Sequence, residues 1–162
     1  PLLVFLKDQT TSRLIDTIIQ LCHKSLLRDL YKNHLKGNLV DLALHPIANF
    51  PIQRLTAASA KYKLVGDVLL MSMEPRSSLL GIILILFQFL QFLRLFDELV
   101  EGVESVLAAG HMGVIVQLAE SCAESGEKQD EMMRCLLNVS LKRFILLKTQ
   151  KGSLFSTAAV FS

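Results

Sequence analysis

The sequence predicts an all-α protein in which helix pairs stack side by side as a partial α-solenoid. Three observations indicate this class. Apolar residues recur at helical spacing along most of the 162 residues, the alternation typical of strands is nearly absent, and similar segments recur at an offset of 37 residues. Repeats of two helices have about this length, and each buries its apolar face against the next repeat.

The N-terminal part is predicted to hold two helices. Residues 10–12 (Thr-Thr-Ser) are a typical N-cap cluster before a helix over 13–22. A second helix over 25–35 places leucines inward and basic side chains outward, and it ends at Gly37. The apolar face of the first helix consists of Leu14, Ile15, Ile18, Ile19 and Cys22.

Proline limits the helices that follow. A short helix over 39–44 ends before Pro46, which cannot continue it. Pro51 is tolerated only in the first turn of a helix, so the next helix is expected to begin near Ala48. Further helices are predicted over 97–109, 112–121 and 127–141.

Charge is distributed in blocks along the chain. Residues 1–64 carry nine Lys and Arg against four Asp and Glu, residues 65–136 carry four against eleven, and residues 137–162 carry four against none. A polyanion would bind the basic first block. The carboxylates expected to form a solvated helix face in the second block are Asp97, Glu98, Glu101 and Glu104.

Residues 65–91 interrupt the repeat. Ser12 and Asn49 are 37 residues apart, whereas Gln53 and Gln117 are 64 residues apart. Removing the 27 residues 65–91 restores the offset of 37. The segment also has its own composition, because it contains an uninterrupted apolar run over 79–87. The predicted division is repeats over 1–64, a hydrophobic insertion over 65–91, a further repeat over 92–138 and a divergent basic tail over 139–162.

The apolar stretch within 79–96 allows a second interpretation, a single membrane-spanning helix. Its core, residues 79–93, would span ~22 Å at ~1.5 Å per residue, whereas a bilayer core needs ~30 Å. Arg76 and Arg94 flank this core. The prediction is therefore a buried helix, with the membrane helix as an alternative.

The most informative motif is His45-Pro-Ile-Ala-Asn-Phe-Pro-Ile-Gln53. It places two amides, Asn49 and Gln53, on the same face of one helical turn, with Phe50 beside them. Amides can hydrogen-bond the edge of a base while a ring stacks on its face, and helical-repeat proteins read single-stranded RNA in this way. The base expected here is uracil. The alternative is an ordinary helix start, with Asn49 as N-cap and Phe50 in the core.

Four segments resemble the Pumilio-like repeats of the nucleolar protein 9 family. They are Asp8-Gln-Thr-Thr-Ser-Arg-Leu, residues 45–55, Phe96-Asp-Glu-Leu and Gly110-His-Met-Gly-Val. The resemblance implies a curved, all-helical array that binds pre-ribosomal RNA. It also implies a location in the nucleus, within the nucleolus, and a role in biogenesis of the small ribosomal subunit. Proteins of the pre-ribosomal particle would be further partners. The chain is expected to be a fragment that holds two or three of these repeats.

In the family pattern, three side chains of each repeat face the bases. In the first repeat a serine and an acid flank a stacking arginine, an arrangement that suits guanine. In the third repeat Gly113 offers no edge contact and Val114 stacks weakly, so only its glutamine remains a candidate. The candidate RNA-binding residues are Ser12, Arg13, Asp16, Asn49, Phe50, Gln53 and Gln117.

No motif predicts an enzyme, a metal site or a cofactor. The chain has no GxSxG, no Gly-rich phosphate loop, no HExxH and no Cys/His cluster, and Cys22, Cys122 and Cys135 lack CxxC spacing. The remaining alternative is a protein-binding scaffold of HEAT type. A scaffold would bury Phe50, whereas an RNA reader would expose Asn49, Phe50 and Gln53 on one concave surface.

Overall fold

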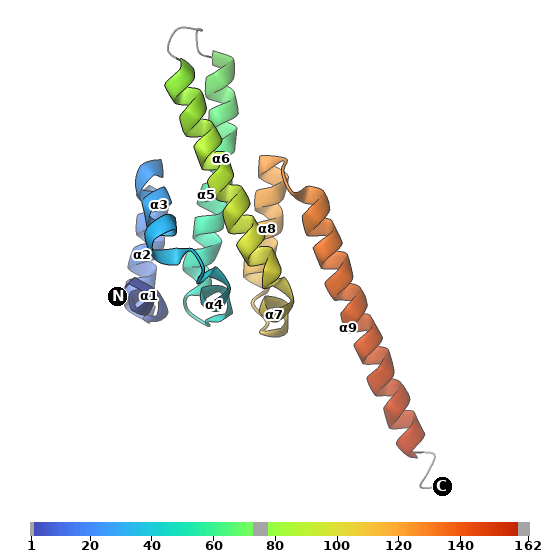
Figure 1. Cartoon of the computed structure of the whole chain (residues 1–162). Helices are drawn as coiled ribbons and strands as arrows, with labels where there is room; N and C mark the ends of the chain where they lie inside the picture. The colour runs from blue at the N-terminus through green and yellow to red at the C-terminus, as the bar shows by residue number, and fades with distance from the viewer. Residues whose placement is uncertain (1, 73–77, 159–162) are drawn as a thin grey trace. The chain divides into compact units, whose positions relative to one another are not determined.

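The computed structural model describes the backbone of residues 2–72 and 78–158, and the side chains of most residues in 2–60 and 92–149. All regular structure in these ranges is helical (Figure 1), so the all-α prediction is confirmed. The elements are α1 (Leu2–Lys7), α2 (Gln9–Leu21), α3 (Lys24–Leu30), a π-helical turn η1 (Tyr31–Leu35), α4 (Leu39–Leu44), α5 (Asn49–Ser72), α6 (Ser78–Glu101), α7 (Val103–Ala108), α8 (Met112–Ser125) and α9 (Gln129–Ala158).

The chain divides into two compact units, Pro1–Gln129 and Asp130–Ser162. In the first unit, α2 packs against α5 and α5 packs against α8, so these three helices form one layer (Figure 1). The helices α4 and α6 contact α5 and contribute to a second layer. Each helix pair thus stacks on the next, as in a solenoid.

The predicted boundaries at 64/65 and 91/92 fall inside α5 and α6, and the boundary at 139 falls inside α9. Most side chains of 65–91 lie outside the described residues, so the insertion and the divergent tail both stay predictions. Among the parts of the chain that the structure describes, none of the helices is long and apolar enough to cross a membrane.

The core of the first unit lies between the two layers. Phe92 and Phe96 on α6 are buried there, with ring centroids 6.3 Å apart. Helical spacing of the apolar residues on each helix brings these side chains together. Other fully buried side chains in this core include Leu27, Leu35, Leu39, Leu42, Ile52, Leu55, Leu95 and Leu99.

The start of α2 differs from the prediction, because Asp8 rather than residues 10–12 caps the helix. Its Oδ2 accepts hydrogen bonds from the backbone N–H groups of Thr10 (3.1 Å) and Thr11 (2.9 Å). A carboxylate at this end satisfies free N–H groups and also interacts favourably with the helix dipole. The bond from the Thr11 backbone is the main reason that the pKa of Asp8 lies below its ordinary value.

The apolar face of α2 is also narrower than predicted. Ile15 and Ile19 are buried, whereas Leu14 and Ile18 are 60% and 43% exposed. Ile15 and Ile19 are therefore the only buried members of the predicted stripe.

Two predicted helices are interrupted. The helix over 25–35 changes from α3 into η1, and the helix over 97–109 is divided at Gly102. A Cβ at Gly102 would overlap the side chain of Val40. The α6–α7 junction and α4 therefore approach each other so closely that glycine is required there.

Glu98 caps another helix. The sequence predicted that it lies on a solvated helix face, and this prediction is wrong. Asn38 precedes α4 without making a side-chain capping bond, and Glu98 Oε1 accepts a hydrogen bond from the Leu39 backbone N–H at 2.9 Å. The Tyr31 hydroxyl donates to Glu98 Oε2 at 3.5 Å. Burial, and then the charge of Glu98, raise the pKa of Tyr31 to about 12, so this hydroxyl remains a donor at neutral pH.

Removing this cap should destabilise the first unit. We expect Glu98→Ala to lower the free energy of unfolding by about 1–3 kcal/mol, because the Leu39 N–H loses a charged acceptor. Urea denaturation followed by circular dichroism measures the change. Glu98→Gln keeps an acceptor oxygen and should cost less, so equal losses in the two variants would show that charge, not the hydrogen bond, matters.

Candidate nucleic-acid interface

A cavity of about 510 Å³ lies in the layer formed by α2, α5 and α8. This volume is within the range of small-ligand sites, ~300–1,000 Å³. Six of the seven candidate RNA-binding side chains line this cavity, and Asn49 is the exception. The lining residues are Gln9, Ser12, Arg13, Asp16, Pro46, Ile47, Phe50, Gln53, Arg54 and Gln117.

Phe50 is the aromatic group of this cavity. It is the second residue of α5, and its side chain is 60% exposed, whereas its neighbours Pro51 and Ile52 are buried. The buried neighbours hold the helix while the ring stays accessible. The interpretation that places Phe50 in the core is therefore wrong, and a ring in this position is available for stacking on a base.

Asn49 does not reach the cavity, and the prediction that it is exposed is wrong. It is only 4% exposed, and its Nδ2 donates to the backbone carbonyls of His45 and Pro46, both at 2.9 Å. The chain turns over residues 46–48 just before α5, and the Asn49 side chain satisfies carbonyls of that turn. Its role in the free protein is structural.

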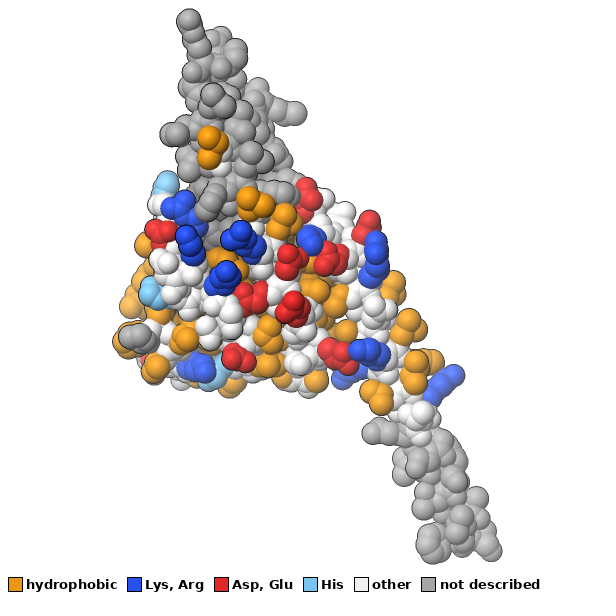
Figure 2. All heavy atoms as spheres, viewed as in Figure 1, with side chains coloured by type: hydrophobic (Ala, Val, Ile, Leu, Met, Phe, Trp, Pro, Cys, Tyr) orange, Lys and Arg blue, Asp and Glu red, His pale blue; other side chains and the backbone are white. Residues whose placement is uncertain are grey.

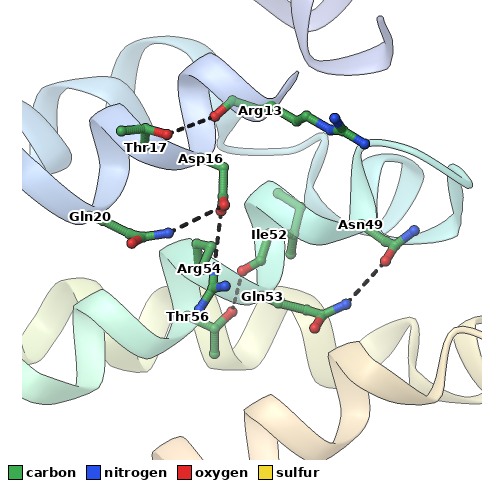
Figure 3. A network of polar contacts seen from close by, with 9 residues as sticks. All are labelled: Arg13, Asp16, Thr17, Gln20, Asn49, Ile52, Gln53, Arg54 and Thr56. Atoms are coloured by element: carbon green, nitrogen blue, oxygen red, sulfur yellow. Dashed lines mark hydrogen bonds and ion pairs between the residues drawn. The ribbon is translucent and has the colours of Figure 1, made fainter. Parts of the chain in front are cut away.

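Gln53 is held next to Asn49, as the spacing predicted. Its Nε2 donates to Asn49 Oδ1 at 3.0 Å across one helical turn (Figure 3). Among the described residues, Gln53 Oε1 and the amide of Gln117 take part in no hydrogen bond. Both glutamines line the cavity, so they can offer donors and acceptors to a ligand.

Asp16 lies between α2 and α5. Its Oδ2 accepts from Gln20 Nε2 at 3.3 Å, and its Oδ1 is 3.3 Å from Arg54 Nε (Figure 3). This ion pair lacks hydrogen-bond geometry, because Oδ1 has no hydrogen-bond partner among the described residues although it is buried. Arg54 is more than half exposed, so the pair contributes little stability and can open.

The remaining first-repeat residues differ in access. Ser12 is buried at 4% exposure, whereas Arg13 is exposed and its guanidinium has no partner among the described residues. With Arg54 and Asp16, the cavity carries two positive charges and one negative charge. The sequence did not single out Arg54, although its place beside Gln53 on α5 was a signal for it.

The face drawn in Figure 2 carries charges of both signs, because Lys and Arg side chains gather on it as well as Asp and Glu. Acidic side chains gather there around α7 and the end of α6, where Glu101 and Glu104 are exposed. Phosphates would be repelled at this place. Within the described parts of the chain, no three His, Cys, Asp or Glu side chains are placed to hold a metal ion.

The fold and the cavity define a helical-repeat protein in which equivalent positions of successive repeats line one surface. Residues 2–158 match the NOP9-like PUF repeat domain, and the chain belongs to this family. The family match confirms the predicted α-solenoid of Pumilio-like repeats. Because the matched range runs through 65–91 and 139–158, it sets no boundaries between repeats.

The chain is similar to proteins named nucleolar protein 9. It is 38% identical to that of Mus musculus over 136 residues and 36% identical to that of Homo sapiens over 137 residues. Identity to that of Schizosaccharomyces japonicus is 25% over 138 residues. The matches cover 84–85% of this chain but only 17% of each relative. No solved structure matches the chain.

Proposed function

We propose that this chain binds single-stranded RNA in the cavity formed by α2, α5 and α8. The observation that carries the proposal is the convergence of three repeats on one site. Arg13 comes from α2, Phe50 from α5 and Gln117 from α8, and all three line the cavity. A scaffold that only contacts proteins would have no need to place a ring, amides and guanidinium groups together in one cavity.

Each side chain has a chemical role in this proposal. Phe50 stacks on one base, and the amides of Gln53 and Gln117 bond base edges. Arg13 and Arg54 each contact a phosphate, and the planar guanidinium of Arg13 also stacks on a base. Asp16 and Ser12 accept from guanine, and for this Asp16 has to separate from Arg54 or share its carboxylate with it.

The target proposed is pre-ribosomal RNA, and the place is the nucleolus. The name of the relatives, nucleolar protein 9, supports the location. A role in small-subunit biogenesis, with proteins of the pre-ribosomal particle as further partners, is part of the same proposal. No catalytic step, metal or cofactor belongs to it.

Binding should depend on salt to a limited degree. Two arginines line the cavity, so two phosphate contacts are expected, and affinity should fall about sevenfold between about 50 and 200 mM salt. Fluorescence anisotropy of labelled oligouridylate with the full chain measures this. Arg13→Ala should reduce the slope of log affinity against log salt by about half. Absence of binding at the lower salt concentration would contradict RNA binding by this chain.

A further inference from the structure

We infer that Gly113 is a positioning residue for Gln53, and that one base is read by amides from two neighbouring repeats. This inference rests on the proposed RNA binding. It replaces the pair of amides that the sequence suggested within one repeat, Asn49 and Gln53. The new pair is Gln53 on α5 and Gln117 on α8.

The first step concerns space. Gly113 is the second residue of α8, and in the family pattern it falls at the first base-facing position of its repeat. A Cβ built at Gly113 would lie 2.7 Å from Gln53 Nε2, 2.9 Å from Oε1 and 3.0 Å from Cδ. The first two separations are shorter than a Cβ tolerates, so the Gln53 amide occupies the volume that any other residue at this position would fill.

The second step concerns the hydrogen-bonding groups. Asn49 Nδ2 donates to two backbone carbonyls, and Asn49 Oδ1 accepts from Gln53, so Asn49 orients Gln53 but is not itself presented to the cavity. Gln117 lies one helical turn after Gly113 and therefore faces the same side of α8. Gln53, against Gly113, and Gln117 both line the cavity.

The third step concerns base choice. Each amide supplies one carbonyl acceptor and one N–H₂ donor, which together complement the O4, N3–H and O2 edge of uracil. The missing side chain at position 113 thus has a function. The third repeat has no edge-reading group at that position because the second repeat's glutamine uses the space.

Replacing Gly113 tests this without damage to the fold. In Gly113→Ala the three atoms nearest to the new methyl group all belong to the far end of one flexible side chain, so Gln53 moves away and the helix gains a better helix former. The melting temperature should stay the same or rise. Affinity for oligouridylate should fall about tenfold, the effect of one lost hydrogen bond that leaves its partner unpaired.

Four proteins complete the experiment, the parent, Gly113→Ala, Gln53→Ala and the double variant, each titrated with oligouridylate and oligoadenylate. The double variant should bind no more weakly than Gln53→Ala, because both changes remove the same contact. The preference for oligouridylate over oligoadenylate should fall in Gly113→Ala, in Gln53→Ala and in the double variant. Val116→Ala is the control, since Val116 is exposed on α8 and does not line the cavity.

The outcomes separate the two proposals. If Gln53→Ala weakens binding but Gly113→Ala does not, or if Gly113→Ala lowers the melting temperature at unchanged affinity per folded molecule, the positioning role is overturned and RNA binding stands. If the effects of Gly113→Ala and Gln53→Ala add, the shared contact is also overturned. If the parent binds neither oligonucleotide, RNA binding itself fails, and the reading of a base by Gln53 and Gln117 fails with it.

Discussion

Replacing Phe50 with alanine should weaken binding of single-stranded RNA about five- to 150-fold and leave the melting temperature nearly unchanged. The range follows from the ~1–3 kcal/mol that stacking of one base on an aromatic side chain contributes by alanine substitution. The ring is 60% exposed, so its removal leaves no internal cavity. Anisotropy titration and thermal denaturation of the same preparations measure both quantities.

Leu14 provides a matched control for this variant. Its side chain is also 60% exposed, but it lies on α2 outside the cavity. Leu14→Ala should therefore change neither affinity nor stability. A large loss of stability in Phe50→Ala, with unchanged affinity per folded molecule, would show that the ring packs rather than stacks. A buried aromatic residue cut to alanine typically costs ~3–5 kcal/mol.

The parts of the fold that follow from local rules could be predicted from the sequence. Pro51 is compatible only with the first turn of a helix, and α5 indeed begins at Asn49. The offset of 37 residues pairs Arg13 with Phe50 and Asp16 with Gln53, and all four side chains line one cavity. Periodicity predicts such features because it depends on neighbours in the chain.

Features that depend on contacts distant in sequence could not be predicted. Glu98 looked solvated because its partner, the Leu39 N–H, lies on another helix. Gly102 did not stand out as a break, because its reason is the approach of Val40. The ion pair between Asp16 and Arg54 joins α2 to α5, and the spacing within either helix does not reveal it.

The same reason explains the one candidate residue that was misplaced. Helical spacing correctly placed Asn49 on the same face as Gln53, and the two amides are hydrogen-bonded. Spacing does not show which carbonyls lie within reach, and here the turn before α5 places those of His45 and Pro46 beside the Asn49 amide. Hydrogen bonds to these carbonyls hold the side chain inward.

Replacing Asn49 with alanine should accordingly destabilise the protein rather than remove a base contact. The Asn49 side chain is buried and makes two hydrogen bonds to backbone carbonyls, so its loss should lower the free energy of unfolding by about 1–3 kcal/mol. Gln53→Ala is the matched variant one turn later on α5. Because the Gln53 side chain is only half-buried, the Gln53→Ala variant should lose RNA affinity with little change in stability.

The contrast between these two variants decides what Asn49 does. Urea denaturation gives the free energy of unfolding of each variant. Anisotropy titration in buffer without urea gives the RNA affinity per folded molecule. Asn49→Ala should still weaken binding slightly, because Gln53 loses the acceptor that orients its amide. If Asn49→Ala instead unfolds at the parent's urea midpoint and loses affinity as strongly as Gln53→Ala, then Asn49 leaves the His45 carbonyl when RNA binds and reads the base directly.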